Sequence, residues 1–444
     1  MNRGMKLIGL TVGALGVGLW TVGCDNDPLS PDVAPTAEAS LVAPGIALTN
    51  AQRTALGGGV AHYTWEVALG PEPFDVVRLH RVVREQGPDD PVRTRGAIFM
   101  LPGSPNYWTQ VFLQPAYSGA VSPDDAVAIY LAQNDIDVWG IDYAWAQVPA
   151  GTTDFTFMRE WGFQKDIDFA YGALGVARSL RVASGQGNTP FHVLGFSYGV
   201  PIAYAIAGAE TQMPPGQRLA KGLVIADFEF LLEDPDRRDA ACSYAAATQT
   251  KMEAGKYHDA IGATLKFIGT LAAQDPDGHF FDPVLTNYQF GLFVGAVNPG
   301  SAWHFVAGEF DGSGIPTGLR FTDPALWVDL MQNGPLYIPL KADADLASMR
   351  CMGDVNTPFD GHLGDITLPI LDVDAAGGAG RGNYTASRTA TTEYRQLHIQ
   401  LLSDAEAALD FGHADLFTAS NAESLVWTPL LAWLLEHQEN RVYP

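Results

Sequence analysis

A serine flanked by glycines stands where an apolar run meets an alanine-rich run. Phe191–Phe196 is rich in β-forming residues, GFSYG occupies 195–199, and 200–209 has the composition of a helix. A nucleophilic serine must project from a very tight strand-to-helix turn, and only glycine tolerates the crowding on either side. We therefore predict that Ser197 is a nucleophile. The N–H of Tyr198, at the start of the helix, would stabilise a developing oxyanion.

Two further stretches could complete such a site. FGHADLF at 411–417 places His413 in a glycine-containing loop late in the chain, and histidine is well suited to take the serine proton near neutral pH. LPGSPN at 101–106 ends another apolar run. Its Ser104 N–H is the candidate second oxyanion donor, because Pro105 has no N–H.

The carboxylate that would orient His413 has two candidates. Asp227 ends the apolar run GLVIAD at 222–227, next to the expected serine strand, from where it could reach His413 and fix its tautomer. Asp374 lies near the end of LPILDVDA at 368–375 and is the alternative. Asp415 follows the histidine so closely that we expect it to cap the next turn.

The elements that must position these residues alternate along the chain. Strands are predicted at 62–69, 74–83, 96–101, 137–142, 191–196, 223–226, 368–373 and 397–402, and helices at 126–132, 166–180, 200–209 and 423–436. The first two strands, separated by GPEP, are typical of a hairpin. Repeated strand–helix units predict the α/β class, with a mostly parallel sheet and helices on both faces, in a core formed by 51–227 and 366–444.

Residues 228–365 are too long to be a plain loop in a compact domain, so we expect an inserted cap. The insertion has stretches with helical composition, such as 248–271, and it concentrates aromatic residues. These aromatics would form either an apolar underside above the serine or the insertion's own core: Phe280, Phe281, Tyr288, Phe290, Phe293, Trp303, Phe305 and Trp327.

With these motifs the chain resembles the α/β-hydrolases over about 63–443. The resemblance rests on the GFSYG elbow, the GHADLF loop, the strand and Pro-Gly turn at 99–105, and VWGID at 138–142. It implies a Ser–His–acid triad, an acyl-enzyme intermediate, and no metal or organic cofactor. Most members carry the acid after strand seven, near Asp374 here, whereas some lipases place it after strand six, which fits Asp227. The family commonly opens the oxyanion loop with His-Gly, where this chain has Pro102-Gly103.

The resemblance favours an esterase or lipase acting on a small-molecule ester with an apolar group. Amide and lactone hydrolysis use the same residues, and a non-catalytic surface protein of the same fold is the alternative from another class. His258, His279, His304 and His362 lack the spacing of a metal site. The GGAGRG stretch at 377–382 predicts a loop near the active-site face rather than a nucleotide cradle.

The first 24 residues are typical of an export signal, with Arg3 and Lys6 before an uncharged run from Leu7 to Val22. TVGC at 21–24 resembles a bacterial lipobox, which implies lipidation of Cys24 and attachment to a membrane only through that anchor. The alternatives are an ordinary cleaved signal, which would leave the protein secreted, and an uncleaved anchor. Residues 25–50, polar and rich in proline, would be a tether. Export would leave Cys242 and Cys351 as a candidate disulfide pair.

The charge balance excludes one class of partner. The chain has 26 Lys and Arg against 50 Asp and Glu, a formal net charge of −24. Proteins bind nucleic acids through basic patches, whose Lys and Arg side chains neutralise the phosphates and release their counterions. Because this chain has a large acidic excess, we expect no nucleic-acid partner. A hydrophobic content of 47% is ample for a large packed core.

Overall fold

The computed structural model of the chain describes residues 46–297, 303–352, 361–380 and 383–438. The expected signal segment, Cys24 and the tether as far as residue 45 lie outside the described residues. The last part of the expected tether, residues 47–50, belongs to the first strand, β1 (Ala47–Gly57).

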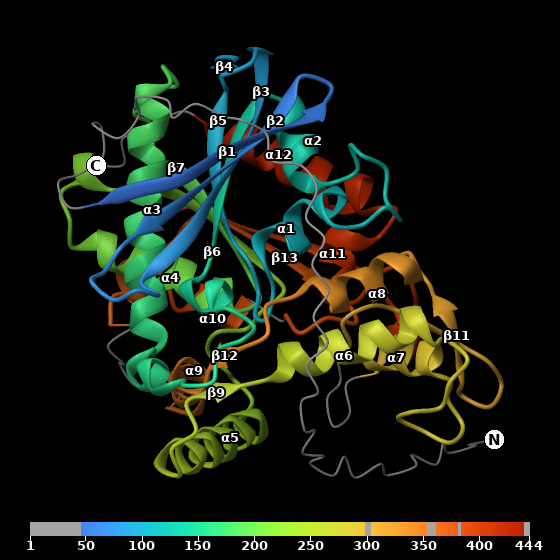
Figure 1. The fold of residues 1–444 in the computed structure, drawn as a ribbon. Coiled ribbons are helices and arrows are strands. Elements are labelled where there is room, and N and C mark those ends of the chain that lie inside the picture. The colour runs from blue at the N-terminus through green and yellow to red at the C-terminus, as the bar shows by residue number, and fades with distance from the viewer. Residues whose placement is uncertain (1–45, 298–302, 353–360, 381–382, 439–444) are drawn as a thin grey trace. The chain divides into compact units, whose positions relative to one another are not determined.

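Within these residues, ten strands form one sheet in the order β1-β2-β3-β6-β5-β7-β8-β13-β14, with β4 paired to β3 (Figure 1). The first four in this order pair antiparallel, and β6, β5, β7, β8, β13 and β14 run parallel. After β1 the bounds are β2 (Val60–Ala68), β3 (Val76–Gly87), β4 (Asp90–Pro91), β5 (Gly96–Leu101), β6 (Ile136–Asp142), β7 (Phe191–Phe196), β8 (Ala220–Ala226), β13 (Ile370–Ala375) and β14 (Tyr394–Ile399). Parallel strands end at a common edge, so the residues that follow β5, β7, β8 and β13 lie at one edge of the sheet.

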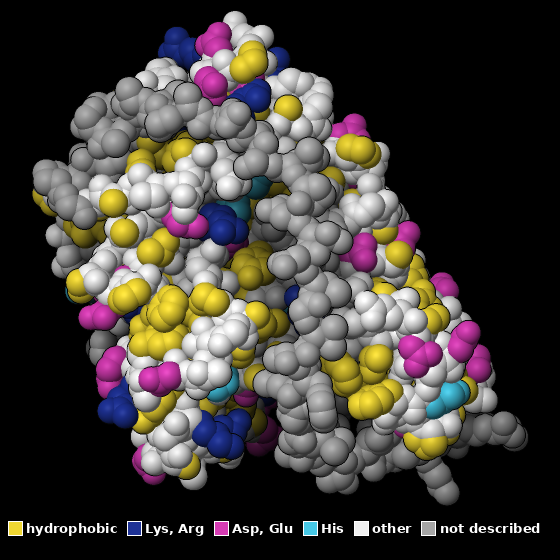
Figure 2. Space-filling view, viewed as in Figure 1, with side chains coloured by type: hydrophobic (Ala, Val, Ile, Leu, Met, Phe, Trp, Pro, Cys, Tyr) yellow, Lys and Arg dark blue, Asp and Glu magenta, His cyan; other side chains and the backbone are white. Residues whose placement is uncertain are grey.

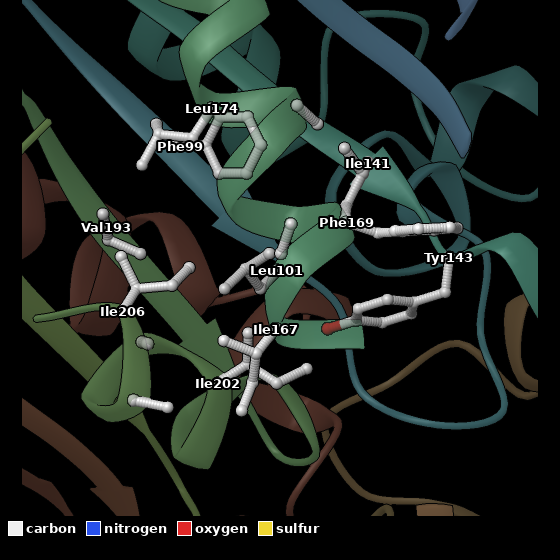
Figure 3. Packing of buried hydrophobic residues seen from close by; sticks show 14 of the residues in the cluster. Phe99, Leu101, Ile141, Tyr143, Ile167, Phe169, Leu174, Val193, Ile202 and Ile206 are labelled. Carbon is white, nitrogen blue, oxygen red and sulfur yellow. The ribbon is translucent and has the colours of Figure 1, made fainter. Parts of the chain in front are cut away.

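Helices cover both faces of the sheet. The core helices are α1 (Trp108–Phe112), α2 (Val127–Gln133), α3 (Phe163–Ala183), α4 (Gly199–Thr211), α10 (Asn383–Ser387), α11 (Asp415–Thr418) and α12 (Thr428–Glu436). Alternation along β5 shows the two layers: Phe99 and Leu101 pack under α3 and α4, with partners such as Leu174 and Ile202 (Figure 3). Met100, between them in sequence, belongs to the opposite apolar cluster with α2 and α12.

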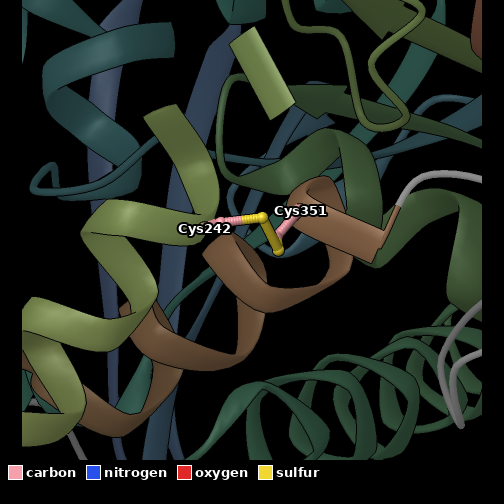
Figure 4. The surroundings of a disulfide bond; sticks show 2 residues. All are labelled: Cys242 and Cys351. Atoms are coloured by element: carbon pink, nitrogen blue, oxygen red, sulfur yellow. A yellow bond between two sulfur atoms is a disulfide. The ribbon is translucent and has the colours of Figure 1, made fainter. Parts of the chain in front are cut away.

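The chain between β8 and β13 forms the insertion. Its elements are α5 (Pro235–Glu253), β9 (His258–Asp259), α6 (Ile261–Gln274), α7 (Asn287–Ala296), β10 (Gly308–Phe310), β11 (Pro316–Leu319), α8 (Pro324–Asn333), β12 (Ile338–Pro339) and α9 (Leu340–Met352). Helices α6, α7 and α8 share a small apolar core that includes Leu292 and Trp327. Helices α5 and α9 are joined by a disulfide between Cys242 and Cys351, the pair that the sequence left open (Figure 4).

One expected helix is interrupted. The helical stretch predicted at 248–271 is divided between α5 and α6, because Gly255 has a φ of +83° just after α5. The Gly255 N–H donates to Met252 O at 2.9 Å and closes the last turn. A glycine in this left-handed conformation ends a helix at low steric cost.

The face drawn in Figure 2 carries Asp and Glu side chains spread among hydrophobic and neutral ones, with Lys and Arg scattered between them. In the described part of the chain, no helix combines the length and the apolar character needed to cross a bilayer.

Candidate active site

Ser197 occupies a strained turn between β7 and α4. Its φ is +52°, a conformation that residues other than glycine rarely adopt. The glycines on either side are required by space. A Cβ on Gly195 would lie 2.3 Å from Gly199 O, and a Cβ on Gly199 would lie 2.4 Å from Leu101 O. The local geometry is therefore the sharp elbow that the GFSYG motif predicted.

His413 lies in the loop after β14 and is 3% exposed. Its ring stacks on Phe196, the residue before Ser197, with 4.5 Å between the ring centroids and 26° between the planes. Both residues are described, and no direct hydrogen bond joins the Ser197 hydroxyl to His413. In sites without substrate such bonds are commonly long and shorten when substrate binds.

Asp227 is the carboxylate that meets His413. It follows β8, has a φ of +50° and is fully buried. Its Oδ2 lies 2.6 Å from His413 Nδ1. Burial alone would raise the pKa of the Asp227 carboxyl, but the hydrogen bonds from His413 and from backbone N–H groups hold that pKa below its usual value. The ionised carboxylate fixes the His413 tautomer that leaves Nε2 able to accept a proton.

A glycine-rich loop holds this carboxylate in place. Asp227 Oδ1 accepts the N–H groups of Ala375 at 3.1 Å and Gly380 at 3.0 Å, and Oδ2 accepts that of Ala379 at 2.9 Å. A Cβ on Gly378 would lie 2.2 Å from Oδ2. The sequence predicted a loop near this face but not that the loop would surround the acid. Residues 381–382 of the same stretch lie outside the described residues.

Asp374, the alternative acid, has other partners. Its Oδ2 lies 2.6 Å from His398 Nδ1, and its Oδ1 accepts the Gln396 amide at 3.0 Å. The cause is the strand register, which places Asp374 of β13 directly opposite His398 of β14. Asp415 does not bond to the His413 side chain either. Its Oδ2 accepts the N–H of Gly412 at 2.7 Å and so stabilises the loop that carries His413.

The two N–H groups expected to bind an oxyanion lie on segments that meet at Ser197. Tyr198 stands at the N-terminus of α4, and Ser104 follows β5. A Cβ on Gly103, next to Ser104, would lie 2.8 Å from Ser197 Cβ and 3.3 Å from Ser197 Oγ. Among the described residues, neither N–H donates to a protein acceptor. Both groups therefore remain able to bind a ligand.

The insertion reaches the histidine loop. The backbone N–H of His413 donates to His304 O at 3.0 Å, and that of Ala414 donates to Phe305 O at 2.6 Å. The rings of Trp303 and Phe305 lie 5.4 and 6.2 Å from the His413 ring. These two aromatics form an apolar wall beside His413.

The other aromatics of the insertion divide between its core and its surface. Phe281, Tyr288, Phe290 and Trp327 pack in the insertion's own apolar cluster, and Phe293 stacks on Phe290. Phe280 is 62% exposed. The expectation of an insertion core therefore holds for these buried aromatics, and Trp303 and Phe305 are the two that lie beside His413.

Within the described ranges, no three His, Cys, Asp or Glu side chains gather closely enough to hold a metal ion. The chemistry that this site can support is nucleophilic attack by a serine, with a carboxylate-oriented histidine as the base.

Comparison with solved structures identifies the fold. A protein from Sulfolobus solfataricus, provisionally assigned as a lipase, aligns with a TM-score of 0.60 and 18% sequence identity, over 89% of this chain and 99% of its own. The likeness shows that this chain has the α/β-hydrolase fold, as the sequence predicted.

Two further structures align more loosely. A soluble variant of monoglyceride lipase from Saccharomyces cerevisiae has a TM-score of 0.40 and 13% identity, over 84% of this chain and 96% of its own. An esterase from Exiguobacterium antarcticum has a TM-score of 0.39 and 10% identity, over 81% and 95%. The chain matches no protein-family model and no curated protein sequence.

Proposed function

We propose that the protein is a serine hydrolase that cleaves carboxylic esters through an acyl-enzyme intermediate. The observation that carries the proposal is the buried Asp227–His413 hydrogen bond beside a strained serine elbow. A binding protein of this fold would need neither the 2.6 Å carboxylate–imidazole contact nor the left-handed serine. The solved lipase-like structure of the same fold supports the same class of reaction.

In the proposed reaction, Ser197 Oγ attacks the ester carbonyl carbon while His413 Nε2 takes the hydroxyl proton. The carbonyl π electrons move to oxygen, and the N–H groups of Tyr198 and Ser104 bind the resulting oxyanion. His413 then returns the proton to the departing alkoxide, and water releases the acyl group by the reverse sequence. Asp227 stays ionised and stabilises the imidazolium.

The apolar wall beside His413 favours an ester with an apolar group on one side of the scissile bond. Trp303 and Phe305 offer ring surface there and no carboxylate or guanidinium. The same residues could cleave amides and lactones. Rates on ester, amide and lactone substrates would show which class the protein prefers.

The test uses the full-length protein in detergent, a fluorophosphonate probe, and p-nitrophenyl esters of short and long acids. We expect the probe to label Ser197, and Ser197→Ala to abolish both labelling and ester hydrolysis. Ser179→Ala is the matched control, because within the described ranges that hydroxyl bonds only to its own helix, at Gly175 O. A folded wild-type protein that neither reacts with the probe nor cleaves any ester would favour the binding alternative.

We also propose that the protein is exported and anchored by a lipid on Cys24. The Cys242–Cys351 disulfide supports export, because such bonds persist in oxidising compartments. Radiolabelled palmitate should be incorporated into the wild-type protein in a bacterial host and not into Cys24→Ala. Equal incorporation into both proteins would refute the anchor.

A further inference from the structure

A buried carboxyl group lies directly behind the proposed oxyanion hole. Asp166, in the first turn of α3, is 4% exposed. Its Oδ2 accepts the hydroxyl of Tyr198 at 2.6 Å and the indole N–H of Trp145 at 3.3 Å. Its sequence neighbour Lys165 pairs instead with Asp75. Burial raises the pKa of Asp166 to about 7, although the bonds from Tyr198 and Trp145 oppose that change.

The Tyr198 side chain is enclosed on two further sides. Its ring meets Tyr143 and Phe163 edge to face, with centroids 5.6 Å apart in each case. The Tyr143 hydroxyl donates to Pro102 O at 3.2 Å, at the start of the loop that carries Ser104. One buried cluster therefore contacts both segments that supply the expected oxyanion donors.

The cluster is well placed to resist a specific movement. Ser197 has an unfavourable φ, and such conformations persist only when the surroundings enforce them. A shift of the Tyr198 backbone at the start of α4 would carry its N–H away from the serine. Because the Tyr198 side chain is fixed at its far end by Asp166, such a shift of its Cα would stretch the 2.6 Å hydrogen bond.

We propose that Asp166 is a positioning residue for the oxyanion hole: through the Tyr198 hydroxyl it keeps the Tyr198 backbone N–H directed at the reacting carbonyl oxygen. The inference rests on the proposed function and adds to it a residue that does not touch the substrate. It also explains why a carboxyl group is kept in the apolar layer under α3 and α4, where replacement by an apolar side chain would avoid the cost of burial.

The variants are Tyr198→Phe, which removes the hydroxyl, and Asp166→Asn, which keeps the shape but replaces one acceptor oxygen by a donor. Loss of a whole oxyanion donor costs about 10²- to 10³-fold in kcat, so a displaced donor should cost about 10- to 100-fold, with KM changed less than about threefold. Tyr204→Phe is the matched control. It removes a buried hydroxyl from the same helix that has no partner in the described structure, and it should keep wild-type kcat.

A transition-state analogue separates positioning from general structural damage. Ser197 Oγ adds to the carbonyl carbon of a trifluoromethyl ketone, and the hydroxyl proton passes to His413. The product is a tetrahedral oxyanion in the oxyanion hole. Its inhibition constant should rise in Tyr198→Phe and Asp166→Asn by the same factor as kcat/KM falls. The double variant should be no worse than the poorer single variant, because both changes remove one interaction.

The outcomes are distinguishable from failure of the proposed function. If the wild-type protein and Tyr204→Phe react with fluorophosphonate at Ser197, the nucleophile is established independently. Wild-type kcat and analogue affinity in Tyr198→Phe would then overturn the role of Asp166 alone, even if Asp166→Asn did not fold. Losses in kcat that leave analogue affinity unchanged, or that are additive in the double variant, would also overturn it.

Discussion

Replacing Asp227 by asparagine should separate the two candidate acids most sharply. Every lone-pair direction of this carboxylate faces a donor: two backbone N–H groups on Oδ1, and one N–H and His413 Nδ1 on Oδ2. The amide nitrogen of an asparagine must therefore face donors in either orientation. Placed at the Oδ2 position, it would donate to Nδ1, and His413 would carry its proton on Nε2.

In that tautomer His413 cannot accept the Ser197 proton. Triads of this kind lose about 10⁴-fold in kcat when the acid becomes its amide. The other asparagine orientation would keep the correct tautomer but leave the N–H groups of Ala375 and Gly380 facing a donor, at a cost of about 1–3 kcal/mol for each unsatisfied buried group. We therefore expect Asp227→Asn to lower kcat about 10³- to 10⁴-fold, with a small change in KM.

The assay is the initial rate on a p-nitrophenyl ester, with Asp374→Asn as the matched control. Asp374 bonds His398 and Gln396, so its amide should keep activity within about twofold of wild type. Circular dichroism and thermal unfolding should show that both variants fold. A loss of more than about 100-fold in the kcat of Asp374→Asn, with Asp227→Asn remaining active, would show that Asp227 is not the acid.

Gly103→Ala should lower kcat about 100-fold without unfolding the protein, because its Cβ would lie 2.8 Å from Ser197 Cβ and force the loop away; steady-state rates and a thermal melt check this. Burial raises the pKa of Asp372 to about 7, above its unfolded value, so its contribution to stability is present below about pH 4 and is lost as pH rises through 7. Asp372→Asn should therefore exceed wild type in unfolding free energy at pH 8, by at most about 4 kcal/mol, and the advantage should vanish near pH 4 in urea titrations. The Cys242–Cys351 bond links residues 109 positions apart, so replacing both cysteines by serine should lower the unfolding free energy by about 2–5 kcal/mol, and a reductant should affect wild type but not the variant.

The sequence was most informative where one residue type was required by local geometry. The glycines around Ser197 predicted the elbow because no other side chain fits against Gly199 O and Leu101 O. The parallel strands β5, β6, β7, β8 and β13 were equally predictable, since each is a short apolar run. The strand β14 (Tyr394–Ile399) was expected at 397–402, three residues too late, because its first three residues are polar or aromatic and exposed. The fold was predicted correctly from these local signals.

Contacts between distant segments were less accessible. Nothing in LPILDVDA shows that Asp374 pairs with His398, because the pairing depends on the register of β13 against β14. The strand β1 was missed because its side chains are mostly exposed and lack an alternating apolar pattern. Asp166 gave no signal either, since an acid in the first turn of a helix is ordinarily a favourable surface residue.

The position of the acid and the glycine content of the loop after β13 have a common explanation. Asp227 and Ser197 end neighbouring strands, and both have left-handed backbones, with φ of +50° and +52°. With the acid after β8, the loop after β13 supplies no carboxylate and instead must approach Asp227 closely enough for two of its N–H groups to reach it, beside the N–H of Ala375 at the end of β13. A side chain at Gly378 or Gly380 would occupy the space of the carboxylate or of its backbone. The lack of an acid in the turn after β13 and the run of glycines there are therefore two consequences of one arrangement, in which the acid of the proposed triad follows β8, next to the serine strand β7.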